Sequence, residues 1–163
     1  REVLSNSRTQ LEVLGEVSTM RARIAAAKSP GGPLDAKLGA GRMQDMELLA
    51  QAGNLLSGGA QGDVAKGLQA CVDIGMLSDA DGKVLSKAYA LCWQVMQSAR
   101  LLSDKPLQPD TIGEAGQAFM LRETGQDSMG ALLKVLEDYA DDAAAVINRT
   151  LAAYANEEPQ DGT

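Results

Sequence analysis

Residues 129–154, MGALLKVLEDYADDAAAVINRTLAAY, decide the fold class of this chain. Apolar side chains recur there every three or four positions for about seven turns, which is the period of an α-helix with one buried face. Ser128 stands directly before the stretch, and serine is a preferred N-cap residue. The opposite face carries the charged residues Lys134, Glu137, Asp138, Asp141, Asp142 and Arg149. The stretch therefore predicts a long helix with one side in the core.

Helical patterns also occupy most of the chain upstream of that helix. They predict further helices over residues 2–27, 42–57, 63–75, 79–102 and 111–123. Ser78 is the expected cap of the fourth of these, with Asp81 three residues later. Only Pro33–Leu38 has an extended pattern, and it is too short to form a sheet. The sequence predicts an all-α bundle of about six helices with no significant sheet.

The first predicted helix has a clear division between its two sides. The expected apolar side holds Leu4, Leu11, Leu14, Val17, Met20 and Ile24. The expected solvated side holds Glu12, Glu16, Arg21 and Arg23. The run Ser29–Pro33 ends the helix, because proline and glycine break helical patterns.

We expect one helical domain over residues 1–155. Within it, residues 1–28 form a long first helix, 29–41 a polar loop and 42–155 the remaining helices, while the polar residues 156–163 form a disordered tail. Cys71 and Cys92 lie in apolar contexts and are interpreted as buried thiols. No apolar run approaches the ~18 residues needed to span a bilayer. With no signal peptide before Arg1, a cytoplasmic piece of a longer protein is expected.

The composition of the chain excludes several kinds of catalytic and binding site. The 163 residues carry a formal net charge of −7 and include no histidine, so Ser-His-Asp and HExxH machinery is excluded. Negative charge and few aromatic rings disfavour nucleic-acid binding. The run Ser78–Gly82 lacks two carboxylates of a calcium loop and is better explained as a cap, and the acidic cluster around Asp141 is typical of a solvated surface. We expect no metal site in this chain.

Polar residues are unusually dense around the start of the second helix, in the segment DAKLGAGRMQDMELLAQ over residues 35–51. Gly39–Gly41 precedes the helix and could direct backbone N–H groups at an anion, but it lacks the Gly-Lys-Ser/Thr ending of a P-loop. Helix initiation needs one capping residue, whereas this segment offers several polar side chains. Two interpretations remain open, namely a cap that fixes the loop and a functional or interface role.

The spacing within this segment resembles one known family. The pattern Met20-Arg21, Lys37, Gly41, Asp45-Met46-Glu47 and Gln51 is similar to the signature of the helical domain of glutamine synthetase adenylyltransferases. The likeness covers residues 10–105 well. Arg42 replaces the second glycine of the family pattern, Met46 replaces an isoleucine and Leu48 a phenylalanine. Because Arg42 has a side chain where the family has a glycine, the replacement argues against a role that needs bare backbone beside a nucleotide.

The resemblance implies a function for the parent enzyme. Members of the family move AMP between ATP and a tyrosine of glutamine synthetase, under control of glutamine and the PII signal protein. Their nucleotidyltransferase domains carry a Gly-Ser turn and an Asp-X-Asp pair that holds Mg²⁺, because phosphoryl-type transfer needs metal ions to neutralise charge. Here Asp79-X-Asp81 follows Ser78 directly, without a glycine turn. We therefore expect an accessory helical domain that is inactive alone and binds neither ATP nor Mg²⁺ by itself.

The resemblance also implies candidate site residues and partners. Lys37, Gly41, Asp45, Glu47 and Gln51 are the candidates for contact with the adjacent nucleotidyltransferase domain or its nucleotide, and no catalytic residue is expected in this chain. The polar tail favours the C-terminal helical domain of the parent. Glutamine synthetase and PII are possible partners, but nucleic acids and membranes are not. The alternatives are a regulatory or protein-binding helical bundle and the related helical domain of a PII uridylyltransferase.

Overall fold

The computed structural model describes residues 2–58 and 62–155, with side chains described between residues 10 and 153, apart from 59–61. Six α-helices and one 3-10 turn form this part of the chain: α1 (Glu2–Ala27), α2 (Met43–Leu56), α3 (Val64–Asp73), α4 (Asp79–Leu102), η1 (Pro109–Thr111), α5 (Glu114–Thr124) and α6 (Met129–Ala155). No strand occurs among the described residues. The prediction of an all-α bundle is confirmed.

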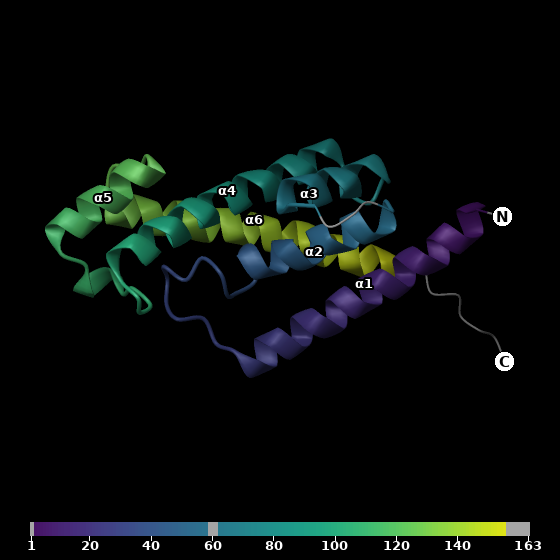
Figure 1. The fold of residues 1–163 in the computed structure, drawn as a ribbon, viewed down its shortest axis with the longest axis horizontal. Coiled ribbons are helices and arrows are strands. Elements are labelled where there is room, and N and C mark those ends of the chain that lie inside the picture. Colours follow the sequence, from purple (N-terminus) through teal and green to yellow (C-terminus); the bar gives the residue numbers. More distant parts are fainter. Residues whose placement is uncertain (1, 59–61, 156–163) are drawn as a thin grey trace.

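The long helices α4 and α6 run side by side through the middle of the molecule (Figure 1). Helices α2 and α3 pack near one end of them and α5 at the other, while α1 crosses α2 and α6 along one side. Leu132, Leu136 and Ile147 of α6 are at most 1% exposed, and the charged residues predicted for the opposite face are exposed. The amphipathic pattern of residues 129–154 is thus confirmed wherever side chains are described.

Side-chain caps fix the starts of α4 and α6 as expected. The Ser78 Oγ accepts a hydrogen bond from the Asp81 N–H at 3.1 Å, and the Ser128 Oγ accepts one from the Ala131 N–H at 3.0 Å. Each serine satisfies an N–H group that has no partner inside the helix. The cap interpretation of Ser78–Gly82 is confirmed. Helix α5 begins at Glu114, later than predicted, because Pro109–Thr111 forms the separate turn η1.

Helices α2 and α3 approach each other at two glycines. A Cβ on Gly67 would overlap the Ala50 carbonyl oxygen, and one on Gly53 would overlap the Gly67 carbonyl oxygen. The Cys71 thiol lies in the same contact and donates to the Leu49 carbonyl at 3.5 Å. Burial raises the pKa of Cys71 to about 12, so this thiol stays protonated and unreactive near neutral pH.

Cys92 of α4 is the second buried thiol, and burial raises its pKa to about 11. The interpretation of both cysteines as buried structural thiols is confirmed. No helix among the described residues is long and apolar enough to cross a membrane.

Helix α1 departs from the predicted division between its two sides. Val13, Leu14 and Val17 are buried, but Met20 is 44% exposed although it was placed on the apolar side. Arg21, placed on the solvated side, is half-buried. The reason is that this part of α1 lies against a polar loop and the start of α2, where the Arg21 guanidinium group binds the carboxylate of Asp45. The predicted position of Leu4 and the predicted tail 156–163 lie outside the described residues and side chains.

The segment Pro33–Leu38 forms turns and bends rather than an extended strand. Its shape comes from Asp35, whose carboxylate accepts hydrogen bonds from the N–H groups of Gly31, Lys37 and Leu38 at 2.8 to 3.0 Å. A carboxylate that binds nearby backbone N–H groups is the usual way in which aspartate stabilises a tight loop. The loop over residues 29–41 is therefore held in a defined shape between α1 and α2.

Candidate functional site

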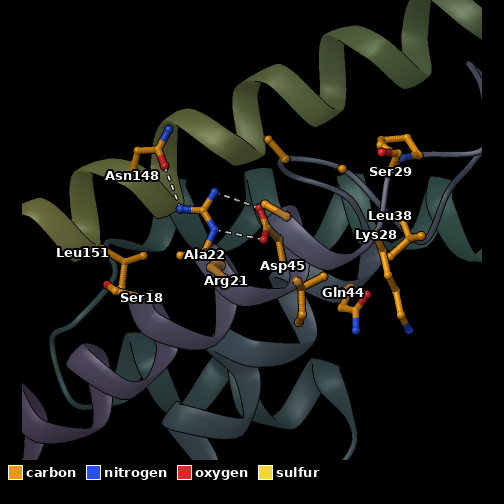
Figure 2. A pocket seen from close by; sticks show the side chains of 15 residues that line it. Ser18, Arg21, Ala22, Lys28, Ser29, Leu38, Gln44, Asp45, Asn148 and Leu151 are labelled. Carbon is orange, nitrogen blue, oxygen red and sulfur yellow. Dashed lines mark hydrogen bonds and ion pairs between the residues drawn. The ribbon is translucent and has the colours of Figure 1, made fainter.

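Asp45, in the first turn of α2, is the centre of the polar segment. Its carboxylate accepts hydrogen bonds from Arg21 Nε at 2.9 Å and Arg21 Nη2 at 2.8 Å, and a third from the Gly41 N–H at 2.8 Å. Arg21 also donates from Nη1 to Asn148 Oδ1 on α6 at 2.8 Å (Figure 2). We call Arg21, Gly41, Asp45 and Asn148 the Arg–Asp clamp. It joins α1, the loop, α2 and α6 at one point.

The two-pronged contact of Arg21 with Asp45 is the strong form of an ion pair. Two parallel N–H···O bonds fix the geometry as well as the charge. The side chains are 19% and 12% exposed, so water screens the pair less than it screens an ion pair on the open surface. Asp45 therefore acts as a structural anchor for the end of α1.

Backbone carbonyl groups of the loop accept hydrogen bonds from the first N–H groups of α2. Its N-cap, Arg42, makes no side-chain cap, and instead the Met43 N–H donates to the Ala36 carbonyl at 3.0 Å and the Gln44 N–H to the Lys37 carbonyl at 3.1 Å. With the Gly41 N–H bound to Asp45, these amides are not free to bind an anion. These hydrogen bonds argue against the anion interpretation of Gly39–Gly41, because the Gly41, Met43 and Gln44 N–H groups each already donate to a protein acceptor.

Gly41 is the point where the loop touches α6. Its φ angle is +72°, a left-handed conformation that glycine adopts without a steric penalty. A Cβ at this position would overlap the Ala140 carbonyl oxygen and crowd the backbone of Ala144. Both constraints require glycine, so Gly41 holds the loop against α6 beside the clamp.

A cavity of about 610 Å³ lies next to the clamp, between the end of α1, the loop and α6. Figure 2 shows the Arg21–Asp45 pair in its wall, with Lys28 and Gln44 further along. Its volume is in the range of small-molecule sites, ~300–1,000 Å³. Much of its lining is apolar, including Ile24, Leu38 and Leu151.

The five predicted site residues do not form one cluster. Gly41 and Asp45 are hydrogen-bonded to each other in the clamp. Lys37 is exposed and borders a different cavity between the loop and the end of α4. Gln51 is exposed and borders a groove of about 170 Å³ between α1 and α2, together with Met20 and Leu55.

Glu47, in the first half of α2, is half-buried. Burial raises the pKa of Tyr89, and the carboxylates of Glu47 and Asp63 raise it further. Glu47 forms no ion pair with a described cation.

Sequence reasoning missed two members of the clamp. Arg21 belongs to the Met20-Arg21 pair of the family pattern, but the amphipathic pattern of α1 predicts it on the solvated face. Asn148 is a polar residue of α6, and nothing in the local sequence marks it as a partner of Arg21. No group of three or more potential metal-binding side chains occurs among the described residues.

Replacing either partner of the ion pair should destabilise the domain. We expect Asp45→Ala or Arg21→Ala to lower the free energy of unfolding by about 2 kcal/mol, because each change leaves a half-buried charge unpaired. In urea titrations of both variants and the double variant, the coupling energy should exceed ~1 kcal/mol. The exposed pair Lys134 and Asp138, with side chains 76% and 54% exposed, is the control, with expected coupling below ~0.5 kcal/mol. Equal coupling in the two pairs would contradict the anchor role.

Comparisons with known proteins give consistent matches. A family model described as GlnD PII-uridylyltransferase matches residues 18–151. The bifunctional glutamine synthetase adenylyltransferase/adenylyl-removing enzyme of Rhodopseudomonas palustris (strain TIE-1) is 28% identical over 156 residues, 93% of this chain and 16% of the relative. A protein of the same name from Xanthomonas campestris pv. campestris (strain ATCC 33913) is 29% identical over 139 residues, 82% of this chain and 15% of the relative.

A further relative with this name, from Xanthobacter autotrophicus (strain Py2), is 27% identical over 158 residues, 94% of this chain. The chain spans only 16% of the length of that relative, so the match concerns one part of a much longer protein. The resemblance to glutamine synthetase adenylyltransferases, predicted from the spacing of residues 20–51, is confirmed.

Proposed function

The chain belongs to the GlnD PII-uridylyltransferase family, and from that membership we propose that it is the helical accessory domain of a bifunctional glutamine synthetase adenylyltransferase/adenylyl-removing enzyme. The names of its relatives support this choice over a PII uridylyltransferase. In the proposal, an adjacent nucleotidyltransferase domain binds ATP and Mg²⁺ and moves AMP between ATP and a tyrosine of glutamine synthetase. The enzyme would act in the cytoplasm, and PII is proposed as a regulatory partner.

The Arg–Asp clamp is the observation that carries the proposed role. It fixes the loop and the start of α2 with hydrogen bonds of 2.8 to 2.9 Å. A rigid support of this kind can hold other side chains in one orientation toward a neighbouring domain. Gly41 and Asp45 would thus act by positioning, whereas Lys37, Glu47 and Gln51 would make the contacts.

The surface around Gln51 fits a protein contact better than a free face. Met20 and Leu55, which border the same groove, are 44% and 64% exposed. Exposed apolar side chains next to polar ones are common where two domains of one chain meet. Glu47 lies four residues before Gln51 and shares its side of α2, so both could contact the nucleotidyltransferase domain.

A Glu47→Ala variant of the full-length enzyme tests this role. We expect the adenylylation rate to fall or the ATP KM to rise by about tenfold, since a lost charged hydrogen bond costs about 1.5 kcal/mol or more. Glu137→Ala, on the exposed face of α6, is the matched control and should change neither constant. An unchanged rate and an unchanged ATP KM in Glu47→Ala would contradict the contact role.

Assays of the full-length enzyme and of this chain alone distinguish the proposed function from its two alternatives, a PII uridylyltransferase parent and a regulatory protein-binding bundle. Transfer of UMP to PII, in place of AMP to glutamine synthetase, would identify a uridylyltransferase parent. Saturable binding of glutamine synthetase or PII to this chain alone would support a regulatory protein-binding bundle. We propose that the chain alone transfers no AMP, because it has no Gly-Ser turn before an Asp-X-Asp pair.

A further inference from the structure

A second cavity, of about 250 Å³, lies between the loop over residues 29–41 and the end of α4. Three cationic side chains border it: Lys37 from the loop, Arg100 from the last turn of α4 and Lys105 from the segment that follows. The positive charge is unexpected in a chain whose net charge is −7. Lys37 is far from the other two residues in the sequence, so only the fold brings the three together.

Two carboxylates also border this cavity, and one of them is already bound. The carboxylate of Asp35 accepts three backbone N–H groups at 2.8 to 3.0 Å, which hold it in the loop while it keeps its negative charge. Arg42 adds a further guanidinium beside the loop, where its Nη1 donates to the Asp35 carbonyl at 3.1 Å. Three cations therefore face two carboxylates around this cavity, and of these two only Asp104 is outside the hydrogen bonds of the loop.

The cations themselves are available for a ligand. The ion pairs found between described residues involve Arg21, Lys134 and Arg149, and none involves Lys37, Arg100 or Lys105. Lys37, Arg100 and Lys105 are all exposed, so water screens their mutual repulsion. Their charged groups are accessible to an anion that enters the cavity.

We propose that this cavity binds an oligophosphate, meaning two or more linked phosphoryl groups. A guanidinium matches two phosphate oxygens at once, and lysines act as point charges beside them. Three cationic donors from separate segments fit an anion with several oxygen acceptors better than a single carboxylate. The volume is below the ~300 Å³ at which sites for drug-sized molecules begin, so it suits a phosphate chain whose remaining part stays outside.

The inference does not depend on the proposed function, since it concerns binding to this chain alone, and it departs from the expectation from the sequence that this chain binds no ATP by itself. It gives Lys37 a ligand and adds Arg100 and Lys105, which the sequence pattern did not single out. Nucleoside triphosphates and inorganic oligophosphates share the relevant chemistry, so the experiment must distinguish them.

Calorimetric titration of the chain at low salt tests the proposal with three probes: inorganic tripolyphosphate, ATP and adenosine. We expect tripolyphosphate and ATP to bind saturably at one site, with an affinity that falls as salt is added, and adenosine not to bind. Equal affinities would indicate recognition of the phosphate chain alone, whereas tighter binding of ATP would identify a nucleotide as the source. No saturable binding of either phosphate compound would overturn the proposal.

Charge variants make the test specific. Lys37→Gln, Arg100→Gln and Lys105→Gln should each weaken tripolyphosphate binding by about fivefold, as expected for the loss of one partly screened charge. Asp104→Asn should strengthen it by a similar factor, a result that a general loss of structure could not produce. Lys87→Gln, exposed on α4, is the matched control and should not change the affinity. An equal loss in Lys87→Gln would show non-specific attraction and contradict the site.

Discussion

A Gly41→Ala variant should lose at least ~3 kcal/mol of unfolding free energy, because it combines a strained backbone with a steric overlap inside the packed bundle. The native φ angle of +72° costs a non-glycine residue about 1 kcal/mol or more. The added Cβ would also overlap the carbonyl oxygen of Ala140, so the loop would have to move away from α6. Movement of the loop would shift the Gly41 N–H away from Asp45 and weaken the clamp.

Gly58→Ala separates the two causes. Gly58 also has a φ of +72°, but no heavy atom outside its chain neighbours lies within 4 Å of the position that a Cβ would take there. Its variant should lose only the backbone contribution of about 1 kcal/mol. Urea titrations followed by circular dichroism give both values. Equal losses in the two variants would mean that the contact between the loop and α6 contributes nothing to the free energy of unfolding.

Gly67→Ala should have the second large effect, again ~3 kcal/mol or more, through overlap with a neighbouring helix backbone. Alanine is the better helix former by about 1 kcal/mol, so any loss must come from packing. A Cβ on Gly67 would overlap the backbone carbonyl of Ala50, and a carbonyl cannot rotate away as a flexible side chain can. Helices α2 and α3 would have to separate at their closest point.

Gly15→Ala is the control for this second change. Gly15 lies inside α1, and its Cβ position has open space around it. The intrinsic preference for alanine should then dominate, and the variant should gain up to ~1 kcal/mol. The two substitutions are chemically identical and are expected to differ in sign, as thermal or urea unfolding would reveal. A stabilised Gly67→Ala variant would contradict the close crossing of α2 and α3.

Most of the secondary structure followed from local signals. The start of α4 was predictable because the Ser78 cap lies three residues from the N–H that it binds, and the long amphipathic period predicted α6. The end of α1 at Ala27 follows from the proline and glycine residues after it. Such features depend on neighbours in sequence, so they can be recognised without a structure.

The candidate site was predictable only in part, because its contacts are long-range. Asp45 and Gly41 were singled out by spacing, but their structural roles arise from Arg21 and from the backbone of α6. The amphipathic pattern of α1 placed Arg21 in water, since periodicity records polarity and not the presence of a carboxylate on another helix. Arg100 and Lys105 become relevant only when the fold brings them beside Lys37.

The connection between Arg21 and Asn148 has a consequence for the order in which the molecule forms. The two residues are 127 positions apart, and the loop glycine that contacts Ala140 also depends on the last helix. During synthesis, the residues of the loop leave the ribosome long before α6 does, and contacts with high sequence separation form late in folding. The end of the loop at Gly41 therefore gains its contact with α6 only after α6 has joined the bundle, whereas the bonds of Asp35 within the loop can form earlier.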